Sequence, residues 1–345
     1  MTTPREDGFA LPPEWAPHSR CWMAWPCRSD LWGERLGAAR QAFAEIARAI
    51  ADFEPVTVIA RPQLTAEASL QLGQGISVLP MAHDDSWMRD TGPTFVTDGR
   101  DRLAGVDWRF NGWGERAPAW EQDAAIARAV LERINVPRYE APVVLEGGAI
   151  HVDGEGTCLA CEASVLDPRR NPGLSRDEME AVLRDHLGVE TVVWLKAGLV
   201  GDPSGGHVDN LACFVRPGAV LALVTRDPND DNHPILEDNL ARLRAATDAR
   251  GRTLEVLEVE QPARRTRDDD GRRLPLSYVN FYLANGAVIV PMFDDGKDKA
   301  ARTAISAAFP DRQLIPIDAS DLVYGGGGIH CITQQQPATA PPAQP

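Results

Sequence analysis

The sequence lacks long apolar runs and is poor in cysteine. It contains no stretch of about 18 consecutive apolar residues, so no segment has the pattern of a membrane-spanning helix. Residues 1–8 lack the basic and then apolar pattern of a secretory signal, so we expect a cytoplasmic protein. Six cysteines in 345 residues are too few for a disulfide scaffold, and a reducing compartment would keep them as thiols available for chemistry.

Positive charge is also scarce. The chain carries 35 Lys and Arg against 50 Asp and Glu, a formal net charge of −15. Such a field repels phosphate backbones and anionic lipid headgroups and attracts small cations, so we expect neither nucleic acid nor a membrane as a partner. With 43% hydrophobic and 25% charged residues, the composition is that of a globular protein with a substantial core.

Apolar periodicity predicts long helices separated by short strands. Apolar residues recur at helical spacing in five segments, 35–53, 123–134, 177–187, 235–246 and 299–309. Short runs rich in Val, Ile and Leu predict strands at 56–60, 76–79, 143–145, 191–195, 220–224, 254–259, 287–290 and 314–317. The last three helices begin about 60 residues apart, with roughly three strands in each step. This spacing favours an α/β repeat around an axis, with a doubly wound sheet as the alternative.

The chain is expected to form one domain. No linker rich in Gly, Ser or Pro divides it, so we assign residues 1–333 to a single domain. The charged stretch 264–273 is typical of a solvated loop rather than a hinge. Residues 334–345 are rich in Pro and Gln without apolar periodicity, and this tail is predicted to be disordered.

Short segments that combine Gly, Trp, acids and His interrupt this rhythm where strands should end. They are residues 84–93, 145–154, 205–210, 280–282 and 325–333. Loops held on a rigid scaffold are where functional sites are built. Candidate functional residues are therefore expected in these five segments.

Cys331 follows four glycines, which permit positive φ and a close approach of the backbone to a ligand. Ile329 and Ile332 beside it suggest the start of a buried strand. Cys331 is therefore either a structural core cysteine or a nucleophile. A nucleophilic thiol must ionise, which needs a positive neighbour such as His330 or a cationic substrate.

His207 and Asp209 are two residues apart, so in an extended strand both would project from one face into one cavity. The alternative is a surface hydrogen-bonded pair. His151 and Asp153 repeat the spacing, and we interpret them as structural. Glu146 lies at the end of an apolar strand, where an unpaired carboxylate is costly, so we expect it to contact a cation or to orient His207.

Acidic residues also surround Trp87. The segment is either a solvated charge run or a cation site, in which Trp87 supplies an apolar wall and Asp90 accepts two N–H bonds from a guanidinium. A metal or nucleotide cofactor is not expected. The C-x-x-C pair Cys158 and Cys161 has no second ligand pair for zinc, and residues 325–328 lack the Lys-Ser/Thr of a phosphate-binding loop.

Taken together, these motifs resemble the agmatine deiminase (agmatine iminohydrolase) family, related to the bacterial-type peptidylarginine deiminases. The resemblance spans nearly the whole chain, through residues 8–9, 22–26 (WMAWP), 84–93 (DDSWMRDTGP), 145–148 (LEGG), 206–210 (GHVDN), 278–281 (YVNF) and 326–335 (GGGIHCITQQ). It implies a five-bladed α/β propeller, or pentein, of ββαβ units with the site on the central axis. It also suggests a homodimer.

The resemblance implies roles for particular residues. Cys331 would be the nucleophile, His207 the general acid and base, and Glu146 its acidic companion. Asp90 and Asp209 would clamp the guanidinium, and Trp87 and Trp113 would line the substrate site, with no cofactor or metal.

The implied reaction is hydrolysis of agmatine to N-carbamoylputrescine and ammonia through an S-amidino-cysteine, in polyamine biosynthesis or arginine catabolism. The chain departs from the family pattern in three loops, 202–206 (DPSGG, without the usual acid near 205), the short loop after 111–114, and 167–172 (DPRRNP). These loops could shape the distal end of the pocket. The alternatives are therefore another guanidino substrate, such as arginine or peptidyl arginine, and a non-catalytic protein that binds cations.

Overall fold

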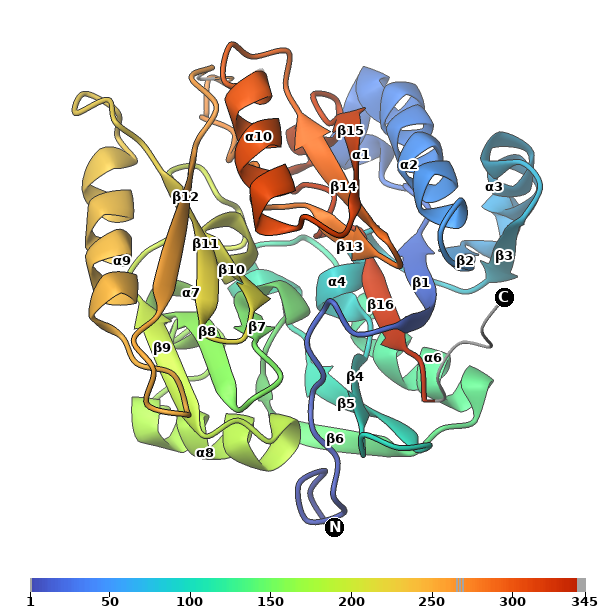
Figure 1. Ribbon diagram of the computed structural model, residues 1–345. Helices are drawn as coiled ribbons and strands as arrows, with labels where there is room; N and C mark the ends of the chain where they lie inside the picture. Colours follow the sequence, from blue (N-terminus) through green and yellow to red (C-terminus); the bar gives the residue numbers. More distant parts are fainter. Residues whose placement is uncertain (1, 265, 267, 269, 340–345) are drawn as a thin grey trace.

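Five small sheets are arranged as blades around a common centre (Figure 1). The computed structural model describes residues 2–264, 266, 268 and 270–339. One sheet has the strand order β16-β1-β2-β3, and the other four are β4-β5-β6, β7-β8-β9, β10-β11-β12 and β13-β14-β15. The prediction of a five-bladed α/β propeller is confirmed, and the doubly wound alternative is wrong.

Each blade begins with an antiparallel strand pair and continues through a helix to a parallel third strand. The innermost strands are β4 (Thr94–Thr97), β7 (Ile150–Val152), β10 (Ala212–Arg216), β13 (Tyr282–Ala284) and β16 (Gln334–Pro337). The second strands are β1 (His18–Ala24), β5 (Leu103–Arg109), β8 (Thr157–Cys161), β11 (Ala219–Val224) and β14 (Ala287–Met292). The outer strands are β2 (Val56–Ala60), β3 (Ile76–Pro80), β6 (Arg138–Val144), β9 (Thr191–Leu195), β12 (Glu255–Glu260) and β15 (Gln313–Asp318).

The crossover helices lie on the outside of the ring (Figure 1). They are α2 (Leu36–Ala51), α3 (Thr65–Leu72), α6 (Ile126–Ile134), α8 (Arg176–Leu187), α9 (His233–Ala245) and α10 (Asp298–Ala308). Shorter helices are α1 (Ser29–Trp32), α4 (Met88–Thr91), α5 (Gly112–Glu115) and α7 (Glu162–Val165). Helix α8 starts at a capping box of Ser175 and Glu178 and stops at Gly188, whose φ is +72°.

The middle strands of the blades are covered on both faces, which explains their continuous apolar composition. All residues of β8 and β11 are buried. Neighbouring residues of a strand point to opposite faces, so Cys158 and Cys161 in β8 belong to different core clusters. The C-x-x-C spacing therefore does not bring these two thiols together. None of the described helices has the length and apolar composition needed to span a bilayer.

The C-terminal strand closes the ring. β16 pairs antiparallel with β1 near the other end of the chain, and the red and blue strands lie side by side in Figure 1. The prediction that disorder begins at Gln334 is wrong for residues 334–337, because backbone pairing and the burial of Gln334 and Gln335 hold them. In the rest of the predicted tail, Ala338 donates its N–H to the Pro17 carbonyl at 2.8 Å, and residues 340–345 lie outside the described residues.

The loop 264–273 was predicted to be exposed to solvent, and this prediction is wrong for its last residue, Arg273. Residues 265, 267 and 269 lie outside the described residues. At the end of the loop Arg273 is buried and forms a two-pronged ion pair with Asp230, at 2.7 and 3.0 Å. The pairing removes the cost of burying either charge alone.

Candidate active site

The five segments singled out in the sequence meet at the centre of the ring. Each one leads into the innermost strand of a blade or includes it: residues 84–93 lead into β4 and residues 325–333 into β16, whereas 145–154 contains β7. The expectation that these segments follow the ends of strands holds closely only for residues 145–154, where Leu145 alone separates Glu146 from the end of β6. Five equivalent positions in the repeat thus supply one site.

A cavity of about 690 Å³ opens at this centre. Trp87 forms part of its wall, is only 5% exposed and stacks on Trp32 with ring centroids 6.3 Å apart. A Cβ on Gly327 would approach the Trp87 ring to 2.5 Å, so a glycine is required at this contact. Cys331, His207 and Asp90 also line the cavity.

Cys331 is 6% exposed and lies in a turn just before β16, not in the strand that its apolar neighbours suggested. Its Sγ lies 3.5 Å from Asp209 Oδ2 and 3.3 Å from Asn280 Nδ2. Burial raises the pKa of the thiol well above its usual value, and the carboxylates of Asp209 and Asp90 raise it further. Without a cation in the site, Cys331 therefore holds its proton.

His207 is buried and placed between carboxylates. It precedes a short 3₁₀ turn, residues 208–210, so the extended strand expected for His207 and Asp209 is wrong. Its Nε2 lies 3.3 Å from Glu146 Oε2 and its Nδ1 lies 3.7 Å from Asp90 Oδ1. Burial lowers the pKa of His207, but Asp90 and Glu146 outweigh burial and raise it to about 9. The imidazole is therefore protonated at neutral pH.

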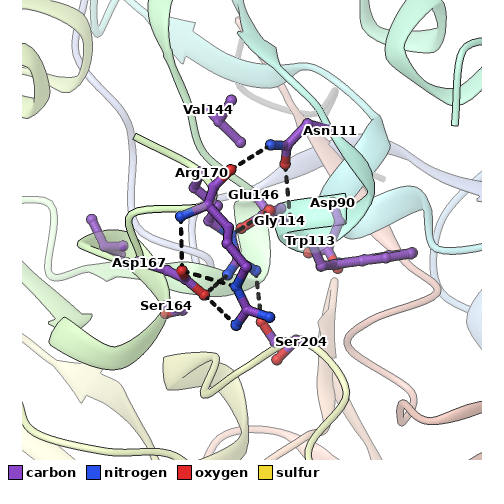
Figure 2. Close-up of polar contacts among 12 residues, drawn as sticks. Asp90, Asn111, Trp113, Gly114, Val144, Glu146, Ser164, Asp167, Arg170 and Ser204 are labelled. Atoms are coloured by element: carbon purple, nitrogen blue, oxygen red, sulfur yellow. Dashed lines mark hydrogen bonds and ion pairs between the residues drawn. The ribbon is translucent and has the colours of Figure 1, made fainter. Parts of the chain in front are cut away.

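Glu146 has the two partners that its predicted burial required. Besides His207, it accepts hydrogen bonds from Arg170 Nε at 2.8 and 3.0 Å (Figure 2). Burial raises the pKa of Glu146, yet Arg170 and His207 bring it below its usual value, so the carboxylate is ionised. Sequence reasoning missed Arg170 as a site residue. Its only signal was the unusual loop 167–172, where it was not linked to Glu146.

Two of the unusual loops are joined through Arg170. Its Nη2 donates to the Ser204 carbonyl at 2.6 Å (Figure 2). Arg116 donates to the same carbonyl at 3.2 Å. Arg116 also pairs with Asp167 at 3.1 Å. A Cβ on Gly205 would lie 2.6 Å from Arg116 Nη1, so the guanidinium fills the space beside this glycine.

Asp90 is oriented by two donors. Trp113 Nε1 donates to Asp90 Oδ2 at 2.9 Å (Figure 2), and the Gly148 N–H donates to Oδ1 at 3.0 Å. Burial raises the pKa of Asp90 to about 6, although His207 lowers it. A Cβ on Gly148 would lie 2.7 Å from His207 Nδ1 and 2.9 Å from both Asp209 Oδ2 and Asp90 Oδ1. Gly148 therefore keeps open the space where the three side chains converge.

Asp209 lies between Cys331 and His330 and contacts both. Its Oδ2 lies 2.9 Å from His330 Nδ1, while its Oδ1 is buried without a hydrogen-bond partner among the described residues. His330 in turn contacts Glu14. In the sequence His330 stands out only as a neighbour of Cys331, and no local signal marks Glu14. Asp153 accepts hydrogen bonds from its own turn at 155 and 157, whereas His151 Nε2 lies 3.5 Å from Glu14 Oε2.

The assembled groups suit one kind of ligand. The carboxylates of Asp90 and Asp209 approach the gap beside Gly148, a tryptophan forms a wall, and a thiol lies next to them. A flat cation with several N–H donors would satisfy the acceptors and favour the thiolate. The predicted residues Cys331, His207, Glu146, Asp209, Asp90, Trp87 and Trp113 are thus brought together by the fold.

Comparisons with known proteins agree with this arrangement. An agmatine deiminase of Stutzerimonas stutzeri is 46% identical, with 98% of each chain covered. The solved agmatine deiminase of Enterococcus faecalis superposes with a TM-score of 0.95 at 37% identity, covering 99% of each chain. A solved C. jejuni agmatine deiminase, with a cysteine changed to serine and substrate bound, superposes with a TM-score of 0.87 at 25% identity. The match covers 96% of this chain and 97% of that one.

The family description matches residues 10–337, almost the whole chain. The expected membership of a deiminase-type hydrolase family is confirmed by this match together with the full-length relatives. The chain belongs to the Porphyromonas-type peptidyl-arginine deiminase family.

Proposed function

We propose that this protein hydrolyses agmatine to N-carbamoylputrescine and ammonia, with Cys331 as a covalent nucleophile. The observation that carries the proposal is the convergence of Asp90, Asp209 and protonated His207 on the gap at Gly148, with the Cys331 thiol 3.5 Å from Asp209. The similarity to agmatine deiminases supports the choice of reaction.

The first step places the guanidinium against the two carboxylates. Its positive charge offsets the field of Asp90 and Asp209, which keeps the Cys331 thiol protonated in the free site. The thiol then loses its proton to solvent. Holding the planar cation with its carbon beside Sγ supplies the orientation that a poor electrophile requires.

The second step forms the covalent intermediate. The thiolate attacks the guanidinium carbon, which forms a C–S bond and a tetrahedral centre. Glu146 engages Nε2 of His207, so Nδ1 is the atom that gives its proton to the departing nitrogen. The C–N bond breaks, ammonia leaves, and an S-amidino-cysteine remains.

The third step is hydrolysis. His207, now neutral, takes a proton from water, and the oxygen bonds to the amidino carbon. The C–S bond breaks, the hydroxyl proton leaves as the carbonyl forms, and the ureido product is released. Such a product of agmatine is a precursor of putrescine, so we place the reaction in polyamine synthesis.

Charges lining the cavity favour a substrate whose distal end is cationic. The lining guanidinium groups already have carboxylate partners, as in Arg28 with Asp85 at 3.3 Å and Arg116 with Asp167 at 3.1 Å. Asp231, by contrast, lines the cavity, is exposed, and has no hydrogen bond or ion pair within the part of the chain that is described. Its carboxylate could receive the primary ammonium of agmatine, whereas the carboxylate of arginine would need a guanidinium without a partner.

The test is ammonia release by the purified protein from agmatine, arginine and a peptidyl arginine. We expect agmatine to have the highest kcat/KM and Cys331→Ser to release no ammonia. A higher kcat/KM for arginine or peptidyl arginine would overturn the substrate assignment. Undiminished turnover in Cys331→Ser would overturn the nucleophile, and binding of agmatine without turnover by the wild-type protein would make it a cation-binding protein.

A further inference from the structure

A buried chain of charged groups runs from the site to the N-terminal segment. His330 Nδ1 lies 2.9 Å from Asp209 Oδ2, and His330 Nε2 lies 2.8 Å from Glu14 Oε1. All three residues are at most 9% exposed. Glu14 lies before β1 and His330 lies before β16, so the ring closure between these strands brings the two residues together.

The geometry determines the protonation of His330. Ionised carboxylates only accept hydrogen bonds, so a ring with each nitrogen against a carboxylate must donate from both and carry a positive charge. Burial and Arg89 lower the pKa of His330, but Glu14 and Asp209 raise it above its usual value. Burial raises the pKa of Glu14, yet His330, Arg89 and His151, whose Nε2 lies 3.5 Å from Glu14 Oε2, bring it well below the usual range. These groups are thus mutually stabilised as ions.

The arrangement leaves Asp209 with one oxygen held and one unsatisfied. Oδ2 contacts His330 and also lies at the gap, 2.9 Å from a Cβ built on Gly148, whereas Oδ1 is buried and has no partner among the described residues. The positively charged ring of His330 therefore lies beside Asp209 Oδ2, the oxygen that is 3.5 Å from Cys331 Sγ.

We propose that Glu14 and His330 are positioning residues for deimination, in which Glu14 holds His330 and His330 fixes Asp209 so that Oδ2, the oxygen facing the gap at Gly148 and Cys331 Sγ, is offered to the guanidinium. The proposal rests on the proposed function. Neither residue reaches the reacting atoms, since Asp209 lies between His330 and the gap at Gly148.

Two substitutions at position 330 separate positioning from packing. In His330→Asn the amide nitrogen takes the place of Nδ1 and keeps the donor to Asp209, whereas in His330→Gln it takes the place of Nε2 and keeps the donor to Glu14. Both variants lose the charge. A hydrogen bond to a charged group is worth enough that kcat/KM of His330→Asn should exceed that of His330→Gln by about tenfold or more. Equal values, or the reverse order, would overturn the proposal.

Glu14→Gln tests the outer half of the chain. His330 then faces Asp209 and Arg89 without Glu14, so its pKa falls and it loses its proton at lower pH. The kcat/KM of Glu14→Gln should stop rising at a lower pH than the kcat/KM of the wild type. The matched control is Glu54→Gln, which removes a buried carboxylate from His18, at 3.2 Å, away from the cavity. If both variants kept the wild-type pH profile, Glu14 would be structural only.

A binding measurement keeps this test separate from the proposed reaction. Methylguanidine has the flat cation without a distal group, and its affinity for Cys331→Ser can be measured by calorimetry. Adding His330→Gln should weaken binding about tenfold, and adding His330→Asn should have a smaller effect. If methylguanidine binds and neither change matters, positioning by His330 is refuted while the proposed function stands. If it does not bind to Cys331→Ser at all, the guanidinium site itself is refuted.

Discussion

Arg170 donates its Nε–H to both carboxylate oxygens of Glu146, at 2.8 and 3.0 Å, and both side chains are fully excluded from solvent. Removing one partner of such a pair leaves an uncompensated buried charge, at a cost of about 3–5 kcal/mol. We therefore expect Arg170→Gln to lower thermal stability markedly.

The same change should alter catalysis. Arg170 lowers the pKa of Glu146, so without it Glu146 loses its charge more readily and supports protonated His207 less. We expect kcat to fall about tenfold or more, because general acid catalysis by His207 would be partly lost. Arg169→Gln is the control, since Arg169 is exposed and pairs with Asp167. An Arg170 variant with wild-type kcat would remove Glu146 and Arg170 from the mechanism.

The pH dependence follows from three groups. Cys331 and His207 both hold protons in the free site at neutral pH, so forming the thiolate beside protonated His207 releases one proton. Between pH of about 6 and about 9, kcat/KM should therefore rise about tenfold per pH unit, and it should level off as His207 titrates. Below about 6 the rise is steeper because Asp90 becomes protonated. A kcat/KM that is flat from pH 6 to 9 would contradict this order of ionisation.

Gly148 offers a test of the space that the site needs. A methyl group there would occupy the gap between His207, Asp209 and Asp90, without backbone strain because the φ of Gly148 is not positive. Gly148→Ala should lower kcat/KM about a hundredfold or more, because misplacement by about 1 Å has effects of that size. Gly296→Ala, where a Cβ meets nothing within 4 Å, should behave as wild type. Full activity in Gly148→Ala would mean that the guanidinium lies elsewhere.

Asp231 tests the distal end of the substrate. Because this carboxylate is exposed, an ion pair with the ammonium of agmatine is worth little, and Asp231→Asn should raise KM for agmatine only about two- to fivefold. The KM for methylguanidine, which has no ammonium, should not change. Glu237→Gln on α9, exposed and not among the residues lining the cavity, is the matched control. Equal effects on both substrates would exclude Asp231 from recognition.

Sequence reasoning predicted the parts of the fold that have strong periodicity. The long crossover helices and the apolar strands such as β2 and β9 appear close to their predicted bounds. The inner strands were missed because β7 and β13 span three residues each, too few to show a period. β16 was missed because its Gln-rich sequence is ordered by pairing with β1, a partner more than 300 residues away.

The candidate site shows the same division. Cys331, His207 and Asp90 stand in distinctive local motifs, so their sequence neighbours signalled them. Arg170 and Glu14 are ordinary charged residues in the sequence. Their roles arise from contacts with Glu146 and His330, and the second of these spans 316 positions. The sequence around each residue does not indicate such long-range contacts.

The covalent intermediate is the most direct test of the account. Acid quenching of the wild-type protein during turnover of agmatine, followed by mass spectrometry of the cysteine peptides, should find the amidino adduct on Cys331 alone. Cys331→Ser should show none, and the other five cysteines, of which four are buried, should remain unmodified. Ammonia release with every cysteine peptide unmodified at all quench times, or an adduct on another cysteine such as Cys27, would contradict the account.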